Sequence, residues 1–295
     1  MRLFHILPII FFLVLILNGC SEQKEKDKIP EVLRIGILPD QSVETLLERY
    51  TPLLVHISSK TGVPYKLIIP ESYEDLLELF DKGSIDLAYF GGLTYSQAHF
   101  TSGAIPLVMR DIDVHFTSYF ISNNKSNSKN IEDFKDKSFS FGSRLSTSGH
   151  LMPRYFLQDK NIIAEKFFKK IQYSGSHDKT AFWVRDGIVD VGAVNSKIID
   201  KLFKEKKLSQ NNINIIWETP PYPDYVWAVQ SNIGPKSRNR IRDAFLSLSY
   251  SKESHAEILQ GLDSKGFLPA SQDDFSLLKD IAFQIGLLKE NSGVH

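Results

Sequence analysis

The chain has 295 residues, with 35 Lys or Arg, 35 Asp or Glu and one Cys. This charge balance argues against a nucleic-acid partner, which requires a basic surface, and a single cysteine excludes a disulfide within the chain. The length suits one large domain or two lobes of ordinary size.

The first nineteen residues have the layout of a secretory signal, in which Arg2 precedes an apolar run over residues 6–17 that is too short to span a bilayer. Residues 17–20, Leu-Asn-Gly-Cys, resemble the lipobox of bacterial lipoproteins. We predict that residues 1–19 are removed and that Cys20 is acylated. The lipid anchors the protein at the extracytoplasmic face of a bacterial membrane, and the residues up to 30 form a flexible tether. The alternative is an ordinary signal peptide with a stray cysteine.

From Glu31 onward, strand-like and helix-like stretches alternate. We predict strands at 32–38, 65–69 and 85–90 and helices at 43–60, 73–81 and from about 93, with Pro52 interrupting the first helix or marking a second start. Strands separated by single helices predict an α/β sheet with parallel pairing and helices on both faces. Ligands of such sheets bind beyond the carboxyl ends of the strands, here at the loops 39–42, 70–73 and 91–95.

A second series of elements follows the polar residues 123–130. It has strands at 138–141, 171–173, 189–194 and 213–217 and helices near 147–158, 177–186 and 197–206. A strand at 225–230 returns the chain to the first lobe, where the helical tail 236–288 packs. The domain prediction is therefore lobe 1 from 31–117 plus 225–295 and lobe 2 from 118–224, with hinge crossings near 115–120 and 218–227 and a ligand cleft between the lobes.

Residues 141–150 form the most specific local pattern, because the chain passes there from a strand through a turn into a helix. Ser146, Thr147 and Ser148 bring three consecutive hydroxyls to the helix N-terminus, where free N–H groups and the helix dipole favour an anion. Ser146 could instead serve only as a helix cap. One hydroxyl suffices for a cap, however, and Gly149 stands where a capping box has Glu or Gln, so we predict an anion site.

Two further segments carry polar side chains at comparable positions. Residues 173–180 repeat the strand, turn and helix layout and bring His177 to the first turn, where it can donate to an oxyanion; the alternative is an exposed or core imidazole. Residues 219–227 contain three prolines and present Asp224 among aromatic residues. A carboxylate there would repel a fully ionised ligand but accept a hydrogen bond from a protonated one. The alternative is an ordinary turn aspartate.

Together these segments resemble the PhnD-like family, the periplasmic binding proteins for phosphonate, phosphite and phosphate of ABC transporters. The resemblance covers residues 33–288, and Ser-Thr-Ser-Gly at 146–149 is its most specific motif. It implies an α/β, two-lobed periplasmic-binding-protein fold, similar to type II, whose lobes close over the ligand by a hinge. It also implies which residues hold the phosphorus oxygens, namely Ser146, Thr147, Ser148 and His177, with Tyr73 lining the pocket from lobe 1.

The sequence departs from the family's aminoethylphosphonate binders at two positions. Where those binders have a tyrosine in the first-lobe loop, this chain has Phe90, so that oxygen contact would pass to Thr94 or Tyr95 or be absent. Where they have an acid that pairs with the ligand's ammonium, this chain has Lys197, which would repel it. The resemblance therefore favours a smaller ligand, such as phosphite, phosphate or a small phosphonate.

We predict a monomeric lipoprotein that captures such an anion for an ABC transporter permease and contacts the membrane only through its lipid, without catalytic residues, metal or cofactor. A sensory protein that signals to a membrane receptor would use the same lobe closure. A hydrolase of phosphorus esters is the other alternative, but neither the Gly-x-Ser-x-Gly elbow nor the His-Glu-x-x-His zinc pair is present.

Overall fold

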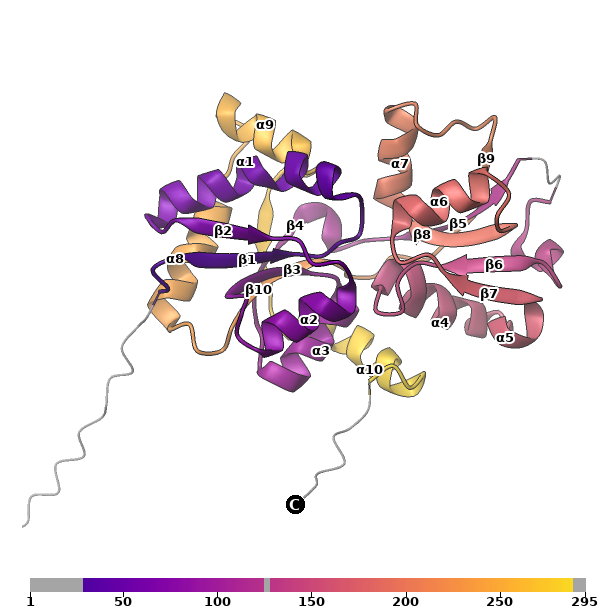
Figure 1. Ribbon diagram of the computed structural model, residues 1–295, viewed down its shortest axis with the longest axis horizontal. Coiled ribbons are helices and arrows are strands. Elements are labelled where there is room, and N and C mark those ends of the chain that lie inside the picture. The colour runs from indigo at the N-terminus through magenta and orange to yellow at the C-terminus, as the bar shows by residue number, and fades with distance from the viewer. Residues whose placement is uncertain (1–28, 125–127, 289–295) are drawn as a thin grey trace, which may run out of the picture.

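The computed structural model describes residues 29–124 and 128–288, and the predicted signal and Cys20 lie outside them. Two α/β lobes lie side by side, each built on one sheet (Figure 1). Within the described residues, no helix combines the length and the apolar character that a membrane span requires. The two-lobed α/β class is as expected from the sequence.

Lobe 1 is built on a six-stranded sheet with the order β11-β4-β10-β3-β1-β2. The strands are β1 (Leu33–Ile37), β2 (Tyr65–Ile68), β3 (Leu87–Phe90), β4 (Ile105–Arg110), β10 (Val226–Val229) and β11 (Phe267–Pro269). The helices are α1 (Val43–Thr61), α2 (Tyr73–Asp81), α3 (Gly92–Ser102), α8 (Pro235–Leu246), α9 (Glu253–Gly261) and α10 (Ser276–Gln284).

Helix α1 shows how local sequence fixes these boundaries. Ser42 caps its first turn by accepting a hydrogen bond from the Thr45 N–H, and Gly62 ends it in the left-handed conformation at φ 64°. The predicted interruption at Pro52 is wrong, because α1 runs continuously past this exposed residue. The buried residues on the opposite face, Leu46, Leu53 and Ile57 among them, hold the helix to the core and outweigh the hydrogen bond that proline cannot donate.

Lobe 2 is built on a five-stranded sheet with the order β7-β6-β8-β5-β9. Its helices cover both faces, and Phe120 and Ile121, adjacent in β5, point into separate apolar clusters on the two sides. The strands are β5 (Ser118–Asn123), β6 (Ser138–Phe141), β7 (Lys170–Tyr173), β8 (Val191–Asn195) and β9 (Ile213–Glu218). The helices are η3 (Thr147–Leu151), a π-helical turn, α4 (Met152–Asp159), α5 (Ala164–Phe167), α6 (His177–Arg185) and α7 (Ser196–Lys204).

The sheets are mixed, whereas only parallel pairing was expected. β1 is parallel to β2 and β3, and β6 is parallel to β7 and β8. β10 is antiparallel to β3 and β4, and β5 is antiparallel to β8 and β9. β4 and β5 were not predicted from the sequence. β5 and β10 each follow a direct crossing from the other lobe, without a helix to reverse the chain, so they enter their sheets from the opposite end.

The two crossings are paired with each other. Phe116 and Tyr222 exchange backbone hydrogen bonds of 2.8 and 2.9 Å, and the Asp224 N–H donates to the Asp113 carbonyl at 2.9 Å. Both segments lie at or next to the ranges predicted for the hinge. The two crossing segments are therefore tied side by side between the lobes.

A buried ion pair stabilises the base of this crossing. Arg110, at the end of β4, donates from Nη2 to Asp113 Oδ1 at 2.7 Å and from Nη1 to the Leu262 carbonyl at 3.0 Å. The side chains of Arg110 and Asp113 are only 5% and 0% exposed. Removing either partner would leave the other charge buried without compensation.

We expect Asp113→Ala to lower the free energy of unfolding by about 3 to 5 kcal/mol, because it leaves the Arg110 guanidinium unpaired in the interior. Glu78→Ala is the matched control, since Glu78 forms an exposed ion pair with Lys82 on α2, and it should cost at most about 0.5 kcal/mol. Urea unfolding of both variants tests this. An equal loss of unfolding free energy in the two variants would contradict the stabilising role of the buried Arg110–Asp113 pair.

Candidate ligand-binding site

The three consecutive hydroxyls lie where β6 leads into η3, and all three are buried. Ser146 does cap the helix, because its Oγ accepts the Gly149 N–H at 2.9 Å, yet its own proton stays available for donation. Gly149 is required by space, since a Cβ there would lie 2.9 Å from both Ser146 Oγ and His177 Cε1. Cap and anion site are therefore compatible.

His177, at the first position of α6, lies against this turn. Its Nδ1 accepts the Asn195 N–H at 3.1 Å, which assigns the ring proton to Nε2. Nε2 is 3.4 Å from Ser146 Oγ. Burial lowers the pKa of His177 to about 3, so the ring is neutral at physiological pH. His177 is thus a buried neutral donor.

Asp224 lies in the second crossing and is also buried. Its Oδ1 accepts the Gly92 N–H at 2.9 Å, at the start of α3 in lobe 1. Burial raises the pKa of the Asp224 carboxyl to about 7. The carboxyl can therefore keep its proton at a higher pH than an ordinary aspartate does.

Three buried polar atoms at this junction lack a hydrogen-bond partner among the described residues. They are Tyr73 Oη at the start of α2, Ser148 Oγ and Asp224 Oδ2. Tyr73 lies beside Ser146, and its charged neighbours include Asp40 and Asp224. A buried polar atom without a partner costs about 1 to 3 kcal/mol, and such atoms call for an explanation. A polar ligand between the lobes would supply the missing partners.

Lobe 1 reaches this group through the turn before α3. The Leu93 N–H donates to Thr147 Oγ1 at 3.0 Å, and a Cβ on Gly91 would lie 3.3 Å from the same oxygen. The structure does not bring the other two predicted residues of this turn to the group. The Thr94 hydroxyl donates to the Gly91 carbonyl, and the Tyr95 ring packs on Phe275, toward the C-terminal segment.

The positions that depart from the family's aminoethylphosphonate binders lie outside this group. Phe90 is buried against Phe80, with ring centroids 5.1 Å apart. The Lys197 side chain is 42% exposed and lies 4.0 Å from Asp200. The predicted repulsion of an ammonium by Lys197 therefore has no support, and its neighbour Asn195 is the residue that reaches the junction.

Sequence analysis missed the residues that join the lobes around His177. The His177 N–H donates to the Asp40 carbonyl at 3.1 Å, across the junction. Asp40 Oδ2 accepts from the Tyr225 hydroxyl, which accepts from Asn195 Nδ2, both at 2.9 Å. At the rim, the Ser42 N–H donates to Asp178 Oδ2 at 3.1 Å. The loop 39–42 after β1 was marked as a ligand loop, but nothing in its sequence singled out Asp40.

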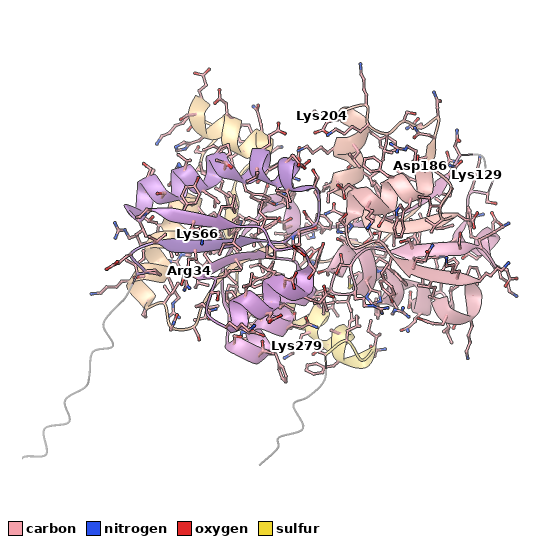
Figure 2. All side chains as sticks on the ribbon, viewed as in Figure 1. Arg34, Lys66, Lys129, Asp186, Lys204 and Lys279 are labelled. Carbon is pink, nitrogen blue, oxygen red and sulfur yellow. The ribbon has the colours of Figure 1, made fainter. Side chains whose placement is uncertain are left out.

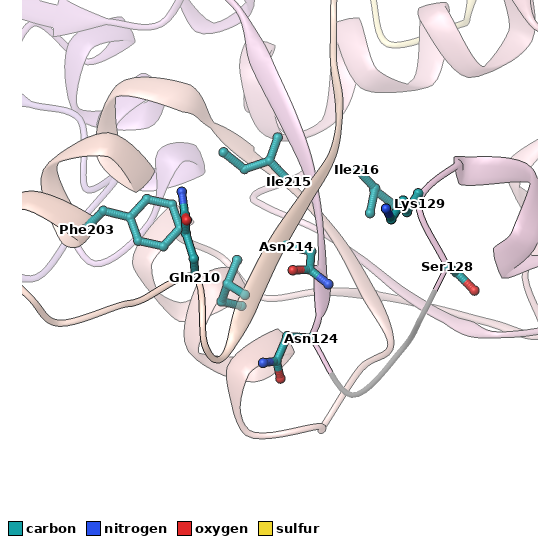
Figure 3. Close-up of a pocket in the computed structure, with 9 residues that line it drawn as sticks. Asn124, Ser128, Lys129, Phe203, Gln210, Asn214, Ile215 and Ile216 are labelled. Atoms are coloured by element: carbon teal, nitrogen blue, oxygen red, sulfur yellow. The ribbon is translucent and has the colours of Figure 1, made fainter.

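A sizeable hollow on the described surface lies elsewhere. It measures about 710 Å³ and lies on lobe 2 beside β9, lined by Asn124, Gln210 and Ile215 among others (Figure 3). None of the buried hydroxyls borders it. An oxyanion needs several convergent donors screened from water, which the junction offers and this open hollow does not. The junction is therefore the candidate site.

The family model for the periplasmic substrate-binding protein of phosphonate ABC transporters matches residues 35–275. The chain belongs to this family. It is 32% identical over 272 residues to the probable ABC transporter phosphite binding protein PhnD1 of Prochlorococcus marinus, covering 88% of this chain and 92% of that protein. It is 27% identical to the phosphonates-binding periplasmic protein of Escherichia coli, covering 93% and 80%.

Among solved structures, the chain is similar to PhnD1 from Prochlorococcus marinus in complex with methylphosphonate. The TM-score is 0.83 at 31% identity, with 88% of this chain and all of that chain covered. This family member therefore has the two-lobed architecture of periplasmic substrate-binding proteins. The fold and family expected from the three motif segments are confirmed.

We expect Asp178→Ala to speed dissociation of an anion bound at the candidate site about tenfold and to leave association unchanged, because its bond to Ser42 joins two lobes and is lost when they separate. Asp186→Ala is the control, since Asp186 lies at the far end of α6 and its carboxylate accepts hydrogen bonds from its neighbour Arg185. Stopped-flow kinetics measures both rates. Unaltered dissociation in Asp178→Ala would contradict the role of this contact.

Proposed function

We propose that the protein captures a small phosphorus oxyanion between its lobes and delivers it to an ABC transporter permease. The observation that carries the proposal is the set of buried, unpartnered atoms Tyr73 Oη, Ser148 Oγ and Asp224 Oδ2 beside the Ser146 and His177 donors. The methylphosphonate complex of PhnD1 supports the ligand class. The family supports an extracytoplasmic location.

In this proposal the ligand oxygens take hydrogen bonds from Ser146, Ser148, Tyr73 and His177 Nε2, while Thr147 holds the α3 turn over them. Closure excludes water and strengthens each of these bonds. Asp224 Oδ2 pairs with the remaining oxygen by sharing one proton with it. The short contacts from Gly92 and Leu93 bring the backbone of lobe 1 to the edge of the site, which favours a small ligand.

The same geometry argues against hydrolysis. In a Ser-His-Asp triad the histidine Nδ1–H donates to a carboxylate, and Nε2 accepts the serine proton. Here Nδ1 accepts a backbone N–H, so Nε2 carries the proton and cannot act as the base for Ser146. We therefore propose binding by a monomer without turnover, in which the permease recognises the closed form.

The proposal includes anchoring by a lipid on Cys20, on the basis of the sequence motif at 17–20. Cys20→Ala should prevent acylation and leave the protein unprocessed or released from the membrane fraction. Metabolic labelling with a fatty acid and cell fractionation test this. A labelled Cys20→Ala protein would refute the assignment.

We expect Ser148→Ala and His177→Ala each to weaken methylphosphonate binding about tenfold or more, because each removes a hydrogen bond to a charged ligand worth roughly 1.5 to 3 kcal/mol. Ser251→Ala and His115→Ala, at exposed positions, are the matched controls. Isothermal titration measures the affinities. Normal binding by both site variants would show that the site lies elsewhere.

Binding should weaken as pH rises through about 7. Below its pKa the Asp224 carboxyl is neutral and donates a hydrogen bond, whereas above it the carboxylate repels the anion. Asp224→Asn keeps a donor that does not titrate, so its affinity should change less between about pH 6 and about pH 8. The ligand's own ionisation is common to both proteins. Parallel pH profiles would contradict the role of Asp224.

A further inference from the structure

Lobe 1 carries a group of cations at the end of its sheet that is remote from lobe 2. Lys60 lies at the end of α1, Lys66 in the edge strand β2, and Lys236, Arg238 and Arg240 in the first half of α8. All are exposed except Arg238, which is half-buried. Figure 2 shows Lys66 on the part of lobe 1 that faces away from lobe 2. We call these five residues the basic end.

The members of the basic end come from separate elements that meet in space. Arg240 reaches the end of α1, since a Cβ on Gly62 would lie 3.2 Å from its Nη2. Lys60, Lys236 and Arg240 line one hollow of about 480 Å³, in which Asp243 is the lining carboxylate. Cations therefore predominate on this surface, although the chain as a whole is balanced.

The stability of α8 does not explain these charges. The first turn of α8 has no acidic residue, and its N-cap Gly234 offers no side-chain hydrogen bond. Lys236 instead brings a cation to the positive end of the helix dipole, which is unfavourable. By contrast, α1, α2 and α6 each have a carboxylate in the first turn. The cations of α8 are therefore not accounted for by its helix dipole.

The described chain begins at the same end. The Leu33 N–H, at the start of β1, donates to the Pro64 carbonyl at 2.8 Å, next to the Gly62 turn that Arg240 covers. Figure 1 shows the first described residues beside α8. Eight residues separate Cys20 from Ile29, and this length spans at most about 30 Å when fully extended. A lipid on Cys20 would hold the basic end close to the bilayer.

We infer that the basic end contacts the anionic phospholipid headgroups of the membrane that holds the anchor; this rests on the lipid anchor proposed above. Lys and Arg side chains near an anionic surface each add roughly 1 kcal/mol of attraction within a Debye length of about 8 to 10 Å. The contact orients lobe 1 at the membrane. The ligand site stays free, because it lies at the other end of β1, toward lobe 2.

The test uses the mature chain without lipid, residues 21–295, which contains every described element. It is sedimented with vesicles of phosphatidylcholine alone or with about one third phosphatidylglycerol, at about 0.1 M and about 0.5 M salt. We expect binding to the anionic vesicles only, and its loss at high salt. Lys60→Gln, Lys236→Gln and Arg240→Gln together should lower the partition coefficient about 100-fold.

The matched control removes three exposed lysines of lobe 2, by Lys166→Gln, Lys169→Gln and Lys170→Gln. It should bind nearly as well as the unaltered chain. Equal loss in the two triple variants, or no binding of the unaltered chain to anionic vesicles, would overturn the inference. Methylphosphonate affinity is measured on the same samples. If the unaltered chain did not bind methylphosphonate, the proposed ligand site would be contradicted, whereas the inference about the basic end would not.

Discussion

A circuit of hydrogen bonds that crosses between the lobes governs the candidate site. The His177 N–H donates to the Asp40 carbonyl, and the Asp40 carboxyl accepts from Tyr225. Tyr225 in turn accepts from Asn195, whose own N–H returns to His177 Nδ1. The circuit fixes the ring proton on Nε2, where it faces Ser146. Because its members come from both lobes, the donor geometry of His177 and the closure of the lobes depend on each other.

The hinge region is tied to this circuit through Tyr225. The Arg110 guanidinium lies 5.6 Å from the centroid of the Tyr225 ring and 5.7 Å from that of Tyr89, while it pairs with Asp113. Asp113 in turn accepts the Asp224 N–H. One buried cation therefore stabilises the crossing strands, the aromatic packing behind them and the backbone that presents Asp224. A rigid support of this kind keeps the site's donors in place while the lobes move about it.

Most of the fold could be predicted from sequence, because periodicity and turn residues are local signals. Ser146, His177 and Asp224 could be proposed as site residues because each follows a strand in a pattern rich in hydroxyls, glycine or proline. The strands β4 and β5 were missed, since they follow no alternating series and their partners lie far along the chain. Asp40 acquires its role only through contacts with His177 and Tyr225, more than a hundred residues along the chain, and Asn195 contacts the same two residues from the end of β8. Thr94 stays a prediction, because its hydroxyl donates to the Gly91 carbonyl within the first turn of α3.

The central claim is that a small phosphorus oxyanion supplies the partners missing at the junction. Isothermal titration of residues 21–295 against phosphite, phosphate, methylphosphonate, aminoethylphosphonate and sulfate tests it most directly. The account predicts tight, stoichiometric binding of one small phosphorus anion, which is recovered unchanged. It predicts weaker binding of sulfate above about pH 7, because sulfate cannot supply the shared proton once the Asp224 carboxyl is ionised. Absence of binding to all four phosphorus compounds, or tighter binding of sulfate than of any of them, would contradict the claim.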